Sequence, residues 1–146
     1  MKVLIVFSAI FMMAFTCVIY QGDMNLYMHE QETLKMIAEE AACQAALCLD
    51  ENAYGEGRRE FDKDMAEEAV SKYIDDSRDL LANGKEYAIT YVVHYEDDET
   101  GYLPENEKKR PSVTVDISAE TDDFFRLPFL KKSEIIRKSK YEIKGL

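Results

Sequence analysis

Positive charge is scarce in this chain of 146 residues, which carries 18 Lys and Arg side chains against 29 Asp and Glu and has a net charge of −11. No basic cluster is larger than the three residues Lys108-Lys109-Arg110. Proteins that bind nucleic acid instead gather Lys and Arg into a patch that meets the phosphates. We therefore expect no nucleic-acid partner. Apolar residues make up 47% of the chain, which is enough for one folded domain of this length.

Histidine and cysteine are also few, with 2 His and 3 Cys in the chain. Neither His29 nor His94 has a second ligand at a metal-binding spacing, and the spacing of Cys43 and Cys48 matches no zinc signature. The glycine patterns of nucleophile elbows, phosphate loops and dinucleotide-binding turns are absent from the sequence. We predict that the protein is not an enzyme and has no catalytic residue, cofactor or metal.

Two local patterns leave alternatives open. Cys43 and Cys48 are interpreted as small apolar residues of a helix face, because a disulfide between them requires the helix to break near Cys48. The four carboxylates of residues 96–99, followed by Gly101, are interpreted as a solvated turn. Calcium is the alternative there, because it binds oxygen ligands, although the spacing is not that of an EF-hand loop.

What the chain does contain is one long apolar run. Residues 3–20 carry no charge, and their polar members are Ser8 and Thr16. About 20 apolar residues in a helix span a bilayer core of ~30 Å, so this run lies at the short end of the transmembrane range. We predict a membrane anchor in residues 1–22 and an exported domain in residues 23–146. The predicted core of the anchor is Ile10, Phe11, Met12 and Met13.

Two other interpretations of the run stay open. A cleaved signal peptide is one, although its apolar core usually has about 7–15 residues and no convincing small-x-small site follows this run. A lipoprotein signal ending at Cys17 is the other, although the residues before that Cys fit such a site poorly. Lys2 precedes the run, whereas Asp23, Glu30 and Glu32 follow it. The positive-inside rule then predicts a single-pass protein with a cytoplasmic N-terminus and an extracytoplasmic segment 23–146.

The first half of the exported segment is predicted to be helical. Residues 24–49 contain neither Gly nor Pro, and their apolar side chains recur every three or four positions. These are Leu26, Leu34, Ile37, Ala38, Ala41, Ala42, Ala45, Ala46 and Leu49. Since Gly22 is the one helix breaker between residues 3 and 49, a single helix of about 70 Å is possible. We expect a turn at residues 52–57, a second helix from about Arg59 to Ala82, and a stop at Asn83-Gly84.

The second half changes to the period of a β-strand. Residues 87–95 and 112–120 alternate apolar with polar or small side chains, and residues 135–143 form a weaker third strand. An antiparallel sheet with one apolar face needs a cover, and the helices are the candidates for it. The predicted fold class is therefore α+β, in which a small antiparallel sheet of about three strands packs on helices.

Charge and apolar side chains near the C-terminus suggest contact surfaces. Residues 23–107 hold 7 basic and 23 acidic residues, a net of −16, whereas residues 108–146 hold 10 and 6, a net of +4. Either this division is an ordinary solvated surface, or it provides complementarity between subunits. The segment 124–130 is a loop, because Pro128 bars it from a central strand. It either covers the core or contacts a membrane surface or a neighbouring subunit. Its candidate contact residues are Phe124, Phe125, Leu127, Phe129 and Leu130.

The order of these elements resembles a known family. An apolar helix runs into an Ala-rich amphipathic stretch, and a second helix follows. The strand Val113-Thr-Val-Asp-Ile117 leads to Leu127-Pro-Phe-Leu130, and the last strand is Ser139-Lys-Tyr-Glu-Ile143. This layout is similar to TadE/TadG-like pseudopilins of tight-adherence (Tad) pili, relatives of the type IV pilins. The apolar run has no acid within it and no Gly before it, so processing by a prepilin peptidase is not expected.

The resemblance implies a non-catalytic, pilin-like accessory or minor subunit of a cell-envelope filament or secretion system. Its implied partners are membrane lipid and other pilus or secretion-system subunits, in a homo- or hetero-oligomer. The alternative function is a secreted or membrane-anchored extracellular binding module with a cleaved signal peptide.

Overall fold

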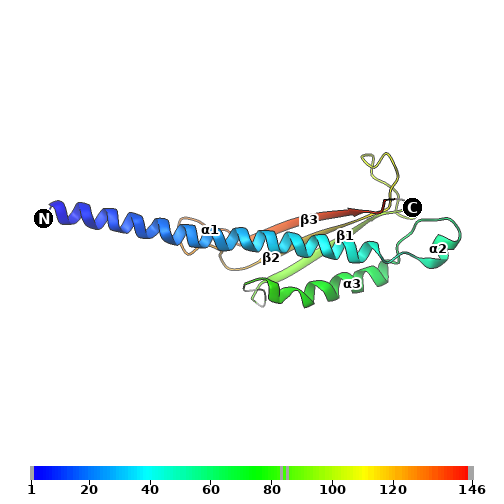
Figure 1. Ribbon diagram of the computed structural model, residues 1–146, viewed down its shortest axis with the longest axis horizontal. Helices are drawn as coiled ribbons and strands as arrows, with labels where there is room; N and C mark the ends of the chain where they lie inside the picture. The colour runs from blue at the N-terminus through cyan, green and yellow to red at the C-terminus, as the bar shows by residue number, and fades with distance from the viewer. Residues whose placement is uncertain (1, 83, 85, 145–146) are drawn as a thin grey trace.

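A computed structural model describes residues 2–82, 84 and 86–144. Its main feature is the helix α1 (Lys2–Ala46), whose 45 residues form one continuous rod of about 68 Å (Figure 1). The possibility of a single helix through Gly22 is confirmed. The helix ends at Ala46 and not at Leu49, so Cys48 lies beyond it and does not belong to a helix face as expected. Residues 2–22 have no fully buried side chain, and burial begins at Asp23. The N-terminal half of α1 therefore extends beyond the rest of the fold.

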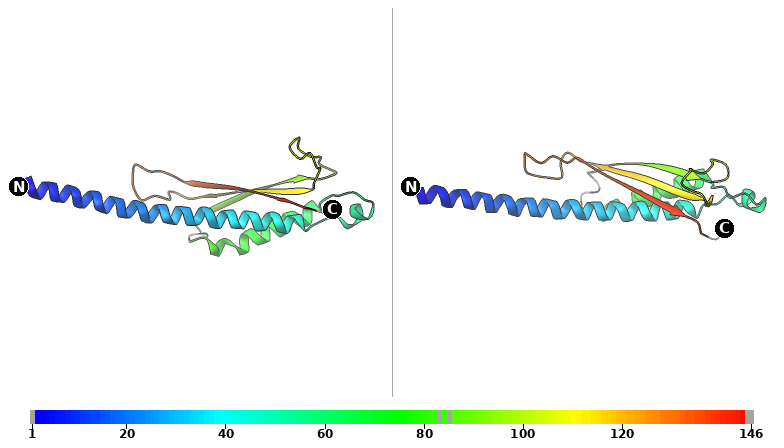
Figure 2. Two further views of the ribbon diagram at one scale, coloured as in Figure 1. Left: turned by 45° about the horizontal axis from the view of Figure 1, so that its top comes forward. Right: turned by 90° about the horizontal axis from the view of Figure 1, so that it is seen from above.

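The C-terminal half of α1 lies across a three-stranded antiparallel sheet. The strands β1 (Ala88–Glu96), β2 (Ser112–Glu120) and β3 (Glu134–Glu142) lie in the order β1-β2-β3. Val93 is paired with Val115, and Ile117 with Arg137. The predicted α+β fold and its three strands are confirmed. β2 has the expected bounds, β1 lies one residue later than expected and β3 one residue earlier. Figure 2 shows the sheet along one side of α1, with the β2–β3 loop on the side nearest the N-terminus.

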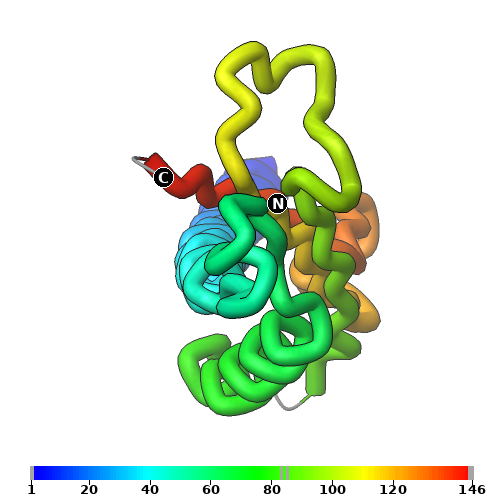
Figure 3. Tube along the Cα trace, turned by 90° about the vertical axis from the view of Figure 1, so that its right-hand side faces the viewer, coloured from blue at the N-terminus to red at the C-terminus, as the bar shows by residue number. Residues whose placement is uncertain are grey.

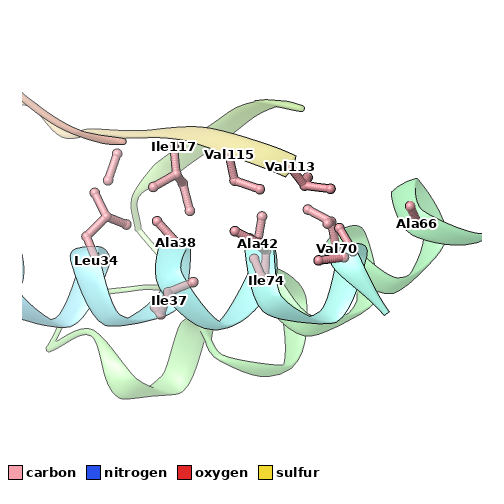
Figure 4. Close-up of a cluster of buried hydrophobic side chains, with 14 of the residues drawn as sticks. Leu34, Ile37, Ala38, Ala42, Ala66, Val70, Ile74, Val113, Val115 and Ile117 are labelled. Carbon is pink, nitrogen blue, oxygen red and sulfur yellow. The ribbon is translucent and has the colours of Figure 1, made fainter. Parts of the chain in front are cut away.

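The core is built from small residues on α1 and branched residues on β2. Ala38, Ala42 and the other predicted alanines of this stripe are fully buried, which lets the helix backbone approach Val113, Val115 and Ile117 (Figure 4). The α-helix α3 (Lys63–Asp76) adds Ala66, Val70 and Ile74 to the same cluster. It packs against α1 on the side of β1 (Figure 3).

The second helix is shorter than predicted at both ends. Asp62 caps α3 by accepting a hydrogen bond from the Met65 N–H, and Phe61 before it pairs with Leu49. Residues 59–61 are thus occupied by other contacts and do not enter the helix. After α3 the chain forms the 3₁₀ turn η1 (Arg78–Leu80). Met65 is exposed, because the buried stripe of α3 runs through Ala66.

The two predicted turns have different outcomes. Residues 52–57 were expected to form a turn, but the turn is confined to residues 56–57, because residues up to 55 belong to the short helix α2 (Glu51–Gly55), capped by the Asp50 carboxylate. The predicted stop at Asn83-Gly84 lies partly outside the described residues, since only Gly84 is described. A Cβ at Gly84 would lie 1.9 Å from the carbonyl oxygen of Arg78, so this close approach requires glycine.

Candidate functional site

The apolar run of α1 has no cover in the structure. The four predicted anchor residues Ile10, Phe11, Met12 and Met13 are all exposed, and α1 is long and apolar enough to cross a membrane. The hydroxyl of Thr16 donates to the carbonyl oxygen of Met12 at 2.9 Å, so this polar group is satisfied within the helix. By length and composition, the run is therefore compatible with a single membrane span.

A charged contact joins the end of this run to the loop between β2 and β3. Asp23 is buried, and its carboxylate accepts hydrogen bonds from Nε of Arg126 at 2.8 Å and from the Arg126 backbone N–H at 2.9 Å. The Arg126 Nη2 lies 2.7 Å from the same carboxylate. Burial acts to raise the pKa of Asp23, but the hydrogen bonds and charge of Arg126 outweigh it, and the pKa is lowered. Asp23 is therefore held as the carboxylate.

Aromatic rings pack beside this ion pair. Phe125 stacks on Tyr20 with ring centroids 6.3 Å apart and lies 5.6 Å from Tyr27. Phe124 is buried between Tyr27, at 5.4 Å, and Tyr87, at 5.7 Å. Such ring pairs add to the apolar burial of the side chains themselves. The contacts fix the loop against α1 at the position where the apolar run ends.

The structure separates the five predicted contact residues of this loop. Phe124 and Leu127 are buried, and Phe125 and Leu130 are half-buried. Phe124 belongs to the core cluster and Phe125 packs against it, as one of the two interpretations expected. Phe129 differs, because it is 70% exposed. Only Phe129 among the five therefore offers most of its side chain to an outside partner.

A second buried carboxylate lies about two turns further along the same face of α1. Glu30 is fully buried, and its Oε1 accepts a hydrogen bond from the Ala82 N–H at 2.8 Å. Its Oε2 has no hydrogen-bond partner among the residues that the structure describes. Burial together with the nearby charge of Glu30 raises the pKa of Tyr87 to about 12. From the sequence, Asp23 and Glu30 were expected only to set the orientation of the run. Glu30 lies on the same helix face as Leu34 and Ile37, and this position is the signal in the sequence for its burial.

The acidic segment after β1 is a hydrogen-bonded turn. Asp97 is fully buried and accepts hydrogen bonds from the Phe61 and Thr100 N–H groups and from the Thr100 hydroxyl. Burial acts to raise the pKa of Asp97, but these donors outweigh it and lower the pKa. The Glu96 carboxylate bonds to Lys140 at 2.6 Å, and that of Asp98 to the Arg59 N–H at 2.8 Å. Each of these carboxylates thus has its own hydrogen-bond partners within the chain. Among residues 2–82, 84 and 86–144, no group of three His, Cys, Asp or Glu side chains is arranged to hold a metal ion.

The remaining candidates lie on surfaces or in the core. His94 is exposed on the outer face of the sheet, with Nε2 3.6 Å from Oδ2 of Asp116, which Lys138 also approaches at 3.4 Å. Cys43 and Cys48 are both free thiols. The Cys48 thiol is buried and 3.5 Å from the Gln44 carbonyl oxygen, and burial raises its pKa.

Comparison of the chain with protein-family models, curated proteins and solved structures finds no match.

Proposed function

We propose that this chain is a non-catalytic, pilin-like membrane protein that serves as an accessory or minor subunit of a cell-envelope filament or secretion system. One observation carries the proposal. A single helix has an apolar half with no buried residue, and its other half packs along an antiparallel sheet (Figure 1). This division of one rod into a membrane half and a packed half is the layout that the resemblance to TadE/TadG-like pseudopilins implies.

The exposed half of α1 needs a cover of lipid or of other helices. It contains ten Val, Leu, Ile and Phe side chains between residues 3 and 19. On insertion scales such residues contribute at most about 0.3–0.6 kcal/mol each, so together they favour the bilayer by up to about 3–6 kcal/mol. In lipid, van der Waals packing between apolar helices brings subunits together. The same helix thus serves both anchoring and assembly.

The orientation follows from the charges on either side of the run. Lys2 is on the N-terminal side, and the domain that follows is acidic from Asp23 onward. We infer a cytoplasmic N-terminus and an extracytoplasmic domain. Continuity of α1 through Gly22, with Tyr20 and Asp23 both in contact with the β2–β3 loop, supports retention of the run. Cleavage near Gly22 would cut α1 between Tyr20 and Asp23, which both contact the β2–β3 loop.

Membrane retention is tested by a matched pair of charge substitutions. Ile10→Asp places a carboxylate in the middle of the run and costs about 2.5–3.5 kcal/mol of insertion free energy. Ile136→Asp makes the same change on the exposed face of β3. We expect Ile10→Asp to leave the membrane fraction and Ile136→Asp to stay there. A wild-type product that is soluble and starts near Gly22 or Asp23 by intact mass would support the secreted binding module instead.

Assembly is tested separately, in the cells that make the protein. A photo-crosslinking residue at Met12 or Met13, in the exposed run, is predicted to join the chain to further copies or to another protein with an N-terminal apolar helix. The same residue at Tyr54 in α2 serves as the control, since Tyr54 is exposed at the opposite end of the molecule (Figure 1). Crosslinks to lipid alone from both run positions would contradict the assembly part of the proposal and leave the anchor intact.

A further inference from the structure

The β2–β3 loop, residues 121–133, is held in a defined shape next to the apolar run. Its base is closed by backbone hydrogen bonds from Thr121 to Ser133 at 2.8 Å and from Phe124 to Lys132 at 2.9 Å. The Asp23–Arg126 ion pair and the Phe125 contacts fasten it to α1. Figures 1 and 2 show that this loop reaches further toward the N-terminal end of α1 than any other part of the sheet domain.

A turn at the end of this loop presents one apolar side chain. The Leu130 N–H donates to the carbonyl oxygen of Leu127 at 3.0 Å, which places Pro128 and Phe129 at the two central positions of the turn. Leu127 is buried below the turn, whereas Phe129 is 70% exposed. Phe124, Phe125, Leu127 and Leu130 are thus buried or half-buried within the fold, whereas Phe129 is exposed to solvent.

Basic side chains surround this turn. Arg126, Lys131 and Lys132 are exposed, and the loop's two acids are Asp122 and Asp123. The Asp123 carboxylate accepts the Phe125 and Lys132 N–H groups at 3.0 and 3.2 Å, so hydrogen bonds within the loop already use it. Residues 23–107 carry a net charge of −16. Since Asp23 already pairs with Arg126, Lys131 and Lys132 are the basic side chains that this end of an acidic domain offers beside Phe129.

We propose that the turn of this loop docks on the membrane surface into which α1 inserts, with Phe129 in the headgroup region and Lys131 and Lys132 against anionic lipid headgroups. The proposal rests on the membrane anchoring proposed above. Phe125 stacks on Tyr20. With the apolar run in the bilayer, Tyr20 at its end would lie where aromatic residues meet the headgroups. An exposed aromatic beside lysines is the combination that binds an anionic interface, at about 1 kcal/mol for each Lys near the surface. The contact gives the domain a second point of attachment and limits its rotation about α1.

Because the chain has no Trp, single Trp substitutions can report lipid contact in the full-length protein. Phe129→Trp tests the loop, Phe11→Trp tests the anchor, and Tyr54→Trp in α2 is the control at the far end of the molecule. Each variant is reconstituted into vesicles that carry 30% anionic lipid by design (about one charge in three headgroups, to give an anionic surface) and a spin label near the headgroup or deep in the acyl chains.

We expect headgroup labels to quench Phe129→Trp and deep labels to quench Phe11→Trp, while Tyr54→Trp is quenched by neither. If Phe11→Trp is quenched and Phe129→Trp behaves like Tyr54→Trp, the loop proposal is wrong and the anchor stands. If Phe11→Trp escapes quenching as well, the anchor itself fails. A Phe129→Trp spectrum that shifts to shorter wavelength with protein concentration, without quenching by lipid labels, would assign the turn to a second copy and overturn the proposal.

Charge provides the second arm of the test. In the Phe129→Trp background, Lys131→Gln and Lys132→Gln are each expected to weaken the loop's contact with anionic vesicles about fivefold. Lys138→Gln, on the outer face of β3, is the matched control and is expected to leave the quenching unchanged. Equal quenching of all three Lys variants in anionic and in zwitterionic vesicles would contradict the role of anionic headgroups.

Discussion

The ion pair between Asp23 and Arg126 makes an asymmetric prediction, because the two partners differ in exposure. Asp23 is buried, whereas the Arg126 side chain is 75% exposed. Removing the Arg126 side chain opens the Asp23 carboxylate to water on the side that Arg126 covers, and water then replaces part of the two lost hydrogen bonds, so the net cost is about 1 kcal/mol. Removing the carboxylate also strands the Arg126 backbone N–H, and a hydrogen bond to a charged group contributes about 1.5–3 kcal/mol. We expect Asp23→Ala to destabilise the loop by about 2–3 kcal/mol and Arg126→Ala by about 1 kcal/mol.

Amide hydrogen exchange of residues 121–133 in the full-length protein measures this local stability directly, because a loop can open without global unfolding. Asp122→Ala, an exposed acid of the same loop, is the control and is expected to change exchange by less than about 0.5 kcal/mol. The folded pKa of Asp23 is lowered, so its contribution is fully present above the unfolded value of about 3.9. Protection should therefore be constant from neutral pH to about pH 5 and fall as the pH drops below about 4. An Arg126→Ala effect equal to or larger than that of Asp23→Ala would refute the reasoning.

Three further predictions concern the fold and are checked by urea unfolding of the full chain in detergent, followed by near-ultraviolet circular dichroism. Asp97→Ala leaves the buried Phe61 N–H without its acceptor and is expected to lower the free energy of unfolding by about 3 kcal/mol. Because the folded pKa of Asp97 is lowered, the wild type should lose this contribution at acid pH, whereas the variant should not. Ala42→Leu overfills the contact between α1 and β2 and is expected to cost about 1–3 kcal/mol, whereas an unchanged midpoint would contradict close packing there. Asp62→Ala removes the N-cap of α3 and is expected to cost about 1 kcal/mol.

The position of the loop bears on how the protein is used. A rigid helix that crosses the membrane leaves the attached domain free to rotate about the helix axis. The proposed contact at Phe129 would select one rotation and present a defined side of the domain to the subunits proposed above. In that arrangement, the acidic α3 and the basic residues of β3 become available as complementary surfaces. The loop and the run are therefore expected to act together in assembly, and the Trp and crosslinking experiments address each one separately.

The sequence by itself determined the features that depend on neighbours along the chain. Residues 3–20 need no partner to be recognised as a membrane-length helix, since length and polarity suffice. The apolar residues Val113, Val115 and Ile117 alternate with other residues and therefore identify the buried face of β2, because successive side chains of a strand point to opposite sides. The alanine stripe of α1 likewise predicted which side of the helix packs, and all three expectations agree with the structure.

The tertiary structure alone decided which charges and which apolar residues are buried. Asp23 finds Arg126 across 103 positions of sequence, and Glu30 finds the Ala82 N–H across 52, so a local pattern gives no reason to bury either carboxylate. The loop shows the same limit, because Leu127 and Phe129 are both apolar, yet only Leu127 lies over the core. Burial depends on what the rest of the chain places opposite a side chain, and that arrangement exists only once α1, the sheet and the loop have come together.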